Sequence, residues 1–331
     1  MNKMKVADIS SRKLAIYSVL FMLGLFLPFI VRSGYMTHVL IICCIWIMMT
    51  TGYNLVLGYT GLFSFGHAGF IAIGAYSSTL LVMNYHLPWP VGLVFAGAMC
   101  AAFALVTGVL VLRLGGVYFA FVTLGFGEII RALILILDDI TEGHFGIPGV
   151  PPLFDSLTTT YMFVFLMMML VFFIVYRIVH SRIGRALIAV RENPAIAASI
   201  GVNVARYTLL AFVVSAVICG VGGAMLVHYL SICYPQLAQI LTSVDLIIFT
   251  KIGGRGTLVG PAIAAFLFTF FPEMFRFIDE WRPLIYALTL VVVLLMAPMG
   301  LEPAIRSLIS RAITYIKSRM FARSKYGITG G

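Results

Sequence analysis

The side chains best suited to chemistry lie in one glycine-rich stretch, residues 52–69, which contains five glycines in 18 residues. Neutral hydroxyl, amide and imidazole groups stand among these glycines, and such groups can contact a small polar solute and release it again. They are Tyr53, Asn54, Thr60, Ser64 and His67. A histidine within an apolar segment is a candidate functional residue. A hydrogen bond between two helices is the alternative role for His67, and the sequence leaves both roles open.

A second glycine-rich stretch spans residues 251–261 and includes two cations, Lys251 and Arg255, to which the sequence assigns no role. Glycine destabilises a helix interior by about 1 kcal/mol relative to alanine. Both stretches therefore predict broken helices or unusually close helix contacts. Broken helices are tolerated in a membrane where protein or an aqueous cavity receives the exposed backbone, which favours a solute path. Small-residue packing between helices is the alternative.

Glu128 and Arg131 are charged residues inside a long apolar run. Their spacing of three places both side chains on one face of a helix, where they can pair. A charge in the bilayer costs about 2.5–3.5 kcal/mol or more, and pairing reduces this cost. We expect an intramembrane ion pair with a structural role, and a role in gating is the alternative.

The sequence predicts no enzyme active site, metal site or cofactor site. No nucleophile elbow, catalytic dyad or cluster of metal ligands is recognisable. The five cysteines form no CxxC or Cys/His pattern and are expected to be small apolar side chains of the core. They are Cys43, Cys44, Cys100, Cys219 and Cys233.

The elements that must position these groups are membrane helices. Hydrophobic residues make up 62% of the 331-residue chain and charged residues only 10%, whereas a soluble domain is about half apolar and about a quarter charged. Long apolar runs without alternation predict helices rather than a barrel. We expect an all-α, polytopic transmembrane helix bundle of eight to ten spans, with ten favoured. The candidate spans are 14–31, 38–57, 62–83, 89–112, 116–137, 161–179, 208–228, 239–252, 258–275 and 283–299.

The distribution of the net charge of +10 predicts orientation rather than nucleic-acid binding. With ten spans, 18 of the 22 basic residues fall in loops and tails on one side of the membrane. Basic loops mark the cytoplasmic side, so both termini are expected in the cytoplasm. We expect a cytoplasmic tail at residues 1–13, a transmembrane domain at 14–305 with a cytoplasmic loop at 180–206, and a basic cytoplasmic tail at 306–331.

The cytoplasmic loop contains a short segment, residues 193–201, with clear helix boundaries. Asn193 suits the N-cap, Pro194 the first helical position, and Gly201 the left-handed residue after the last turn. A helix this short is unstable alone in water. It therefore packs in a groove of a cytoplasmic partner or on its own bundle, and the residues alone favour neither.

Several long motifs in a fixed order carry a resemblance to a known family. They are GYNLVLGYTGLFSFGHAGFIAIGAY, LRLGGVYFAFVTLGFGEIIR, TEGHFGIPG, SRIGRALIAVRENPAIAASIGVNVARYTLLAFVVSA and GGRGTLVGPAIAAF. From about residue 45 to 302 the chain resembles the longer of the two permease types of branched-chain amino-acid ABC importers. The resemblance implies transport of leucine, isoleucine and valine across the bacterial inner membrane. Urea or a short amide is the alternative solute, and an ion-coupled secondary transporter is an alternative from another class.

The resemblance also implies partners: a second related permease, two cytoplasmic ATPases that bind ATP and Mg²⁺, and a periplasmic solute-binding protein. The chain itself lacks the G-x-x-x-x-G-K-[ST] phosphate loop. The 193–201 segment would be the helix that couples to an ATPase. The residues expected to serve this coupling are Arg191, Glu192, Asn193, Pro194, Ala197, Ala198 and Gly201.

Overall fold

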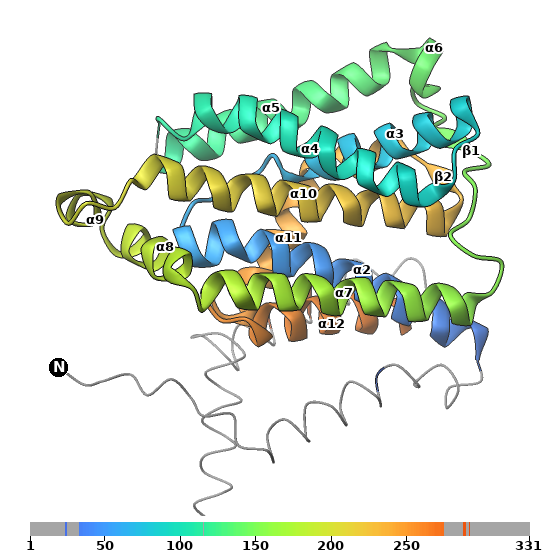
Figure 1. Ribbon diagram of the computed structural model, residues 1–331. Helices are drawn as coiled ribbons and strands as arrows, with labels where there is room; N and C mark the ends of the chain where they lie inside the picture. Colours follow the sequence, from blue (N-terminus) through green and yellow to red (C-terminus); the bar gives the residue numbers. More distant parts are fainter. Residues whose placement is uncertain (1–23, 25–32, 115, 275–286, 289–290, 292–331) are drawn as a thin grey trace, which may run out of the picture.

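The computed structural model describes residues 24, 33–114, 116–274, 287–288 and 291, and in this part the chain is an all-α helix bundle (Figure 1). Six segments are long and apolar enough to cross a membrane, which confirms a polytopic membrane protein. They are α2 (Gly34–Asn54) with the π-helix η1 (Leu55–Thr60), α3 (His67–Tyr85), α4 (Trp89–Val111), α5 (Gly116–Ile136), α7 (Leu157–Val179) and α10 (Val204–Leu230).

Two predicted spans differ from the observed helices. The span predicted at 62–83 begins only at His67, because residues 61–66 form no helix. The span predicted at 239–252 is α11 (Ile240–Gly253), whose 14 residues reach about 21 Å and cannot cross a hydrocarbon core of about 30 Å. The span predicted at 258–275 corresponds to α12 (Val259–Met274). The predicted spans 14–31 and 283–299 lie almost entirely outside the described residues.

Helix α10 runs through the middle of the bundle and packs against α2, α3 and α4 (Figure 1). Helix α2 in turn packs against α7 and α12. The contact between α3 and α10 is very close, because a Cβ atom on Gly74 would strike the backbone of Gly220. Small residues at such a contact let two backbones approach and gain van der Waals contact, which drives helix association in a membrane.

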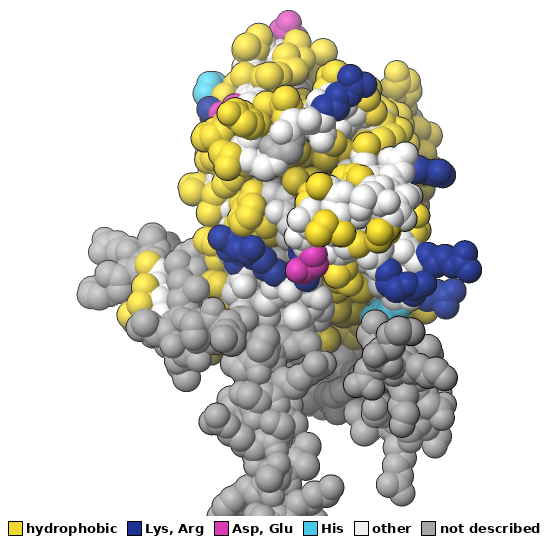
Figure 2. All heavy atoms as spheres, turned by 90° about the vertical axis from the view of Figure 1, so that its left-hand side faces the viewer, with side chains coloured by type: hydrophobic (Ala, Val, Ile, Leu, Met, Phe, Trp, Pro, Cys, Tyr) yellow, Lys and Arg dark blue, Asp and Glu magenta, His cyan; other side chains and the backbone are white. Residues whose placement is uncertain are grey.

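The two ends of the bundle differ in charge. At one end lie α8 (Arg182–Glu192) and α9 (Pro194–Ser199), with the last turn of α7 and the first turn of α10. Figure 2 shows Lys and Arg side chains gathered on this end, and the exposed arginines here include Arg113, Arg177, Arg182, Arg185 and Arg206. At the opposite end is α6 (Asp138–Thr141), which begins with two acidic residues. The described loops therefore separate by charge as the sequence predicts.

The acidic end is held together by a small set of hydrogen bonds between loops. Strands β1 (Ile147–Pro148) and β2 (Ile232–Cys233) pair antiparallel beside the C-terminal end of α10. His228 of α10 connects this rim to its neighbours, since its Nε2 lies 2.8 Å from Ser78 Oγ and its Nδ1 lies 2.8 Å from the carbonyl oxygen of Pro151. The loop before α7 is thereby fixed to the end of the central helix.

Candidate functional site

The first glycine-rich stretch forms a break between two membrane helices. Helix α2 continues directly into the π-helix η1, which ends at Gly61 in the left-handed region with a φ of 77°. Residues 61–66 then run without helical structure until α3 begins at His67. The broken helix is one of the two arrangements that the glycines predict. π-helical turns are rare and often occur at functional sites.

His67 is the centre of a fully buried polar cluster. Its Nδ1 lies 2.9 Å from Ser64 Oγ and its Nε2 lies 2.9 Å from Ser215 Oγ on α10. Tyr53 contacts the imidazole edge-on, with ring centroids 4.6 Å apart, and donates a hydrogen bond of 2.9 Å to the carbonyl oxygen of Ser64. Both imidazole nitrogens therefore have partners within the protein, as a hydrogen bond between helices requires.

Two further hydroxyl groups connect the break to the surrounding helices. Thr123 Oγ1 on α5 accepts a hydrogen bond of 3.1 Å from the backbone nitrogen of Phe65, and Ser243 Oγ on α11 accepts one of 2.8 Å from the backbone nitrogen of Ala68. Backbone N–H groups of a broken helix need such partners, because the membrane offers no water. Thr123, Ser215 and Ser243 are functional candidates that the sequence did not reveal, since each is a lone hydroxyl in an apolar helix.

The second glycine-rich stretch breaks the helix between α11 and α12 and meets the first break. Asn54 Nδ2 donates a hydrogen bond of 2.7 Å to the carbonyl oxygen of Thr257. Gly58 lies beneath this amide, and a Cβ atom there would collide with Asn54 Oδ1. The same Cβ atom would lie only 2.8 Å from the backbone nitrogen of Gly256. We call the contact among Asn54, Gly58, Gly256 and Thr257 the glycine junction.

Lys251 and Arg255 flank the glycine junction and share an aromatic partner. Lys251 Nζ lies 4.8 Å from the ring centroid of Phe63, and Arg255 Cζ lies 5.3 Å from it. A cation over an aromatic ring contributes about 0.5–1 kcal/mol at an exposed site. The sequence did not indicate these contacts, which connect both cations to Phe63 in the first break.

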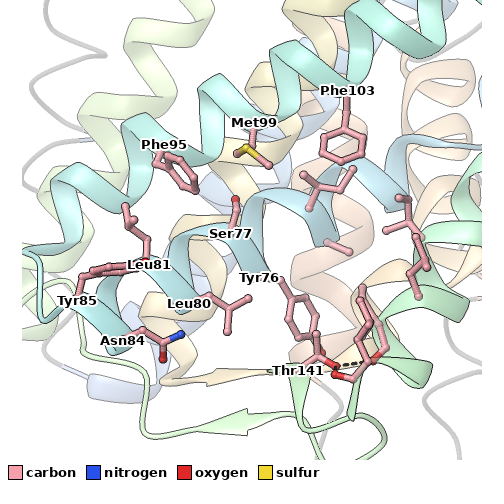
Figure 3. Close-up of a pocket in the computed structure, with 16 residues that line it drawn as sticks. Tyr76, Ser77, Leu80, Leu81, Asn84, Tyr85, Phe95, Met99, Phe103 and Thr141 are labelled. Atoms are coloured by element: carbon pink, nitrogen blue, oxygen red, sulfur yellow. Dashed lines mark hydrogen bonds between the residues drawn. The ribbon is translucent and has the colours of Figure 1, made fainter. Parts of the chain in front are cut away.

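All five residues predicted to contact a solute are buried: Tyr53, Asn54, Thr60, Ser64 and His67. Thr60 Oγ1 donates to the carbonyl oxygen of Val56, one turn back in its own helix, at 2.6 Å. A cleft of about 550 Å³ opens elsewhere, between α3, α4 and α5 (Figure 3). Its wall is mainly apolar and includes none of the five predicted residues. Its polar members are Tyr76, Ser77, Asn84, Tyr85 and Thr141. Their contact with a solute stays a prediction.

The loop at the basic end contains two helices, whereas the sequence analysis identified one. Helix α8 begins at Ser181, whose side chain accepts a hydrogen bond from the backbone nitrogen of Ile183 at 3.0 Å. Its buried side chains include Ala186, Leu187 and Val190. A serine N-cap followed by apolar residues three and four apart is the signal that could have identified this helix.

The short helix α9 has the predicted boundaries. Asn193 Oδ1 accepts hydrogen bonds from the backbone nitrogens of Ala195 and Ile196 at 3.0 and 3.1 Å. Pro194 is the first helical residue, and Gly201 has a φ of 88°, which favours glycine. Ala197 is buried against the protein's own bundle, whereas Ile196 and Ile200 are 61% and 70% exposed. The large apolar side chains exposed here are therefore Ile196 of α9 and Ile200, its C-cap, and the predicted coupling residue Ala198 is exposed as well.

Glu128 and Arg131 form an ion pair on α5, with Arg131 Nε 2.8 Å from Glu128 Oε2. Their side chains are 37% and 39% exposed. The pair lies on the outside of the bundle, away from the glycine junction. Among the described residues, no group of three or more His, Cys, Asp or Glu residues could hold a metal ion.

Comparison with known proteins identifies the family of this chain. The sequence model of a family described as "Branched-chain amino acid transport system / permease component" matches residues 35–297. The chain belongs to this family of ABC transporter permeases. It is a multi-pass protein of the inner membrane.

Relatives of this permease include both types of branched-chain amino-acid permease. The high-affinity branched-chain amino acid transport system permease protein LivM of Escherichia coli (strain K12) is 32% identical, over 84% of this chain and 72% of the relative. LivM of Salmonella typhimurium is 31% identical over the same shares. The permease protein LivH of E. coli K12 is 24% identical, over 77% of this chain and 90% of the relative. No solved structure matches the permease.

Proposed function

We propose that this permease is a subunit of an ATP-driven importer for leucine, isoleucine and valine and forms half of its translocation path. The family and the names of the LivM and LivH relatives support this class of solute. A branched-chain amino acid is a zwitterion with an aliphatic tail. Neutral polar groups and apolar walls can pass such a molecule without holding it tightly.

Helix α9 carries the proposal. It is capped at its first residue and protrudes from the basic end of the bundle (Figure 1). Ile196 and Ile200 are both exposed there, beside exposed arginines. Ala197 packs this six-residue helix on the bundle, and the large apolar side chains on its other side mark a protein contact, because they protrude into solvent. We infer that the two isoleucines enter a groove of a cytoplasmic ATPase.

The remaining partners follow from this assignment. The chain has no phosphate loop, so ATP and Mg²⁺ are bound by the two ATPase subunits. A second permease of the LivH type completes the path, which the similarity to LivH supports. A periplasmic binding protein delivers the amino acid. The end bearing α8 and α9 faces the cytoplasm, as do the tails 1–13 and 306–331, because basic loops mark that side.

Purification in mild detergent, followed by reconstitution with the copurified subunits, tests this function. We expect an ATPase and a second permease to copurify, and uptake of radiolabelled leucine into proteoliposomes to require ATP and the binding protein. Isoleucine and valine should compete with leucine, and urea should not. Uptake that proceeds without ATP, or urea uptake in place of leucine uptake, would contradict the proposal.

A further inference from the structure

Arg191 is the penultimate residue of α8, and only Asn193 separates this helix from α9. The sequence predicts a contact of Arg191 with the ATPase, but its side chain turns inward. Its Nη1 donates a hydrogen bond of 2.9 Å to the carbonyl oxygen of Gly58 in η1, and the side chain is 29% exposed. Glu192 fixes the other edge of the guanidinium, with its Oε1 2.8 Å from Arg191 Nη2.

The Arg191 side chain lies against both helix breaks, with its aliphatic part at the first and its guanidinium at the second. Gly58 lies in the last turn of η1, where backbone carbonyls have no partner within the helix. A Cβ atom on Gly256, in the second break, would strike Arg191 Nη1. A Cβ atom on Gly61, in the first break, would lie 3.1 Å from Arg191 Cγ. Arg191 thus fills a position beside the glycine junction that only glycines leave open.

Helix α8 connects Arg191 closely to α9. The inward face of α8 packs against η1 and α7 through Leu187 and Val190, which are almost completely buried. The outward face of α9, in contrast, has no partner among the described residues. A force on Ile196 and Ile200 is therefore transmitted through one linker residue to a helix whose end is hydrogen-bonded to the glycine junction.

We propose that Arg191 is the positioning residue that connects the ATPase-binding helix α9 to the glycine junction, so that movement of α9 changes the ends of both broken helices. This inference rests on the proposed importer function. Coupling between two sites needs a physical element that both sites influence, and the Arg191–Gly58 hydrogen bond is such an element. The planar fork of arginine suits the role, because it contacts Glu192 and Gly58 at once.

The test uses the complete importer in proteoliposomes, with leucine uptake and ATP hydrolysis measured on the same preparation. Uptake by the unaltered importer establishes the proposed function first, so its failure is distinguishable from failure of this inference. For Arg191→Ala we expect about tenfold less leucine carried per ATP hydrolysed, within the usual range of coupling between sites. The ATPase subunits should remain bound in unchanged ratio. Arg191→Lys should restore part of the leucine uptake per ATP, because lysine keeps a hydrogen-bond donor group at this position.

Arg185→Ala is the matched control, since Arg185 lies on the same helix and its side chain is exposed. It should leave both uptake and the uptake per ATP unchanged. An Arg191→Ala importer with the unaltered yield per ATP overturns the inference. Loss of the ATPase subunits from this variant also overturns it, because Arg191 would then act in binding the partner.

A cysteine pair provides a second test, in which a chemical crosslink replaces the contact between residues 191 and 61. A Cβ atom on Gly61 would lie 4.0 Å from Arg191 Cβ, within the range of about 3.5–4.5 Å for a disulfide. Gly61→Cys combined with Arg191→Cys should crosslink under mild oxidation in membranes, and either variant alone should not. We expect the oxidised pair to transport more leucine per ATP than the same protein after reduction. Failure to crosslink, or equal yields in the two states, overturns the inference.

Discussion

The inner and outer helices of the permease differ in how much of their apolar surface is buried within the protein. The most apolar stretches of α2 with η1, of α3 and of α10 are 78%, 67% and 72% buried within the protein. The corresponding stretches of α4, α5 and α7 are 33%, 28% and 28% buried. The inner group carries the broken helix, the His67 cluster and the Gly74–Gly220 contact. The outer group presents large apolar side chains to its surroundings.

This difference shows where the protein places its polar groups. His67, Ser64 and Ser215 lie among the inner helices, where every helix has protein on several sides and polar groups find partners. The outer helices are largely exposed outside the protein, and in a membrane protein apolar side chains suffice on such a surface. The ion pair of Glu128 and Arg131 is the exception, because it lies on the half-exposed side of α5. The variants of Gly74, His67 and Glu128 below test this division, and a variant of α9 tests assembly.

The largest effect is expected from Gly74→Leu, where any side chain would strike the backbone of Gly220. Overpacking normally costs about 1–3 kcal/mol and more where backbones are in contact, so we expect no folded protein in detergent. Gly125→Leu on α5 is the control, because a Cβ atom at Gly125 has open space around it. Size-exclusion profiles of both variants provide the measurement. A monodisperse Gly74→Leu protein would contradict the close contact.

The next effect is expected from His67→Ala, which removes both hydrogen bonds of the buried imidazole and its ring contacts. Ser64 and Ser215 would lose their imidazole partner, and each buried polar group without a partner costs about 1–3 kcal/mol. We expect a clearly lower thermal unfolding temperature, measured on the purified protein. His144→Ala, at an exposed loop position, should leave that temperature unchanged. Unaltered stability with lost leucine uptake would instead favour a role in the solute path.

The double variant Ile196→Glu and Ile200→Glu is expected to have a smaller effect on folding. Its effect on assembly with the ATPase should be specific. Two charges on the outward face of α9 should weaken ATPase binding about tenfold or more, as loss of apolar contacts at the centre of an interface does. The permease itself should keep its unfolding temperature. Ser199→Glu adds one charge to an exposed position of the same helix and serves as control. Titration of the ATPase onto permease in nanodiscs measures the difference.

The smallest effect is expected from Glu128→Gln on the outer side. An ion pair that is partly exposed contributes about 0–1 kcal/mol, so the unfolding temperature in detergent should hardly change. The double variant Glu128→Gln with Arg131→Gln should then have the same unfolding temperature as the single variant. If the face instead contacts apolar lipid or a partner, the single variant leaves Arg131 without its ion-pair partner in an apolar setting. It would then be less stable than the double variant in a bilayer.

The sequence predicted those features that depend on neighbouring residues. Asn193, Pro194 and Gly201 define the ends of α9 by local rules of capping and backbone conformation, and the structure has this helix at the predicted place. The glycine content of residues 52–69 likewise predicted either a broken helix or unusually close helix contacts, and the structure has the break. The long apolar runs of α4, α5, α7 and α10 predicted spans close to the observed bounds.

The features that the sequence did not predict depend on distant segments. The apolar run 62–83 gave no sign that α3 begins only at His67. Thr123 of α5 holds the non-helical backbone before this helix, and Ser243 of α11 accepts from the backbone nitrogen of Ala68 in its first turn. The inward turn of Arg191 depends on Gly256, 65 positions away, since only a glycine there leaves room for the guanidinium. Burial of Ala197 and exposure of Ile196 depend on how α9 sits against α8 and α10.

The central helix α10 has a consequence for how the two faces of the membrane communicate. Its 27 residues form one continuous rod of about 40 Å. Asn203 caps one end beside α9, through a hydrogen bond of 3.0 Å from the backbone nitrogen of Arg206, and His228 ties the other end to the rim. Both ends of α10 are therefore fixed to loops at opposite ends of the bundle. A tilt of about 5° at the basic end would displace the rim by about 3.5 Å over that length, so the length of this one helix sets how far a movement at one end is carried at the other.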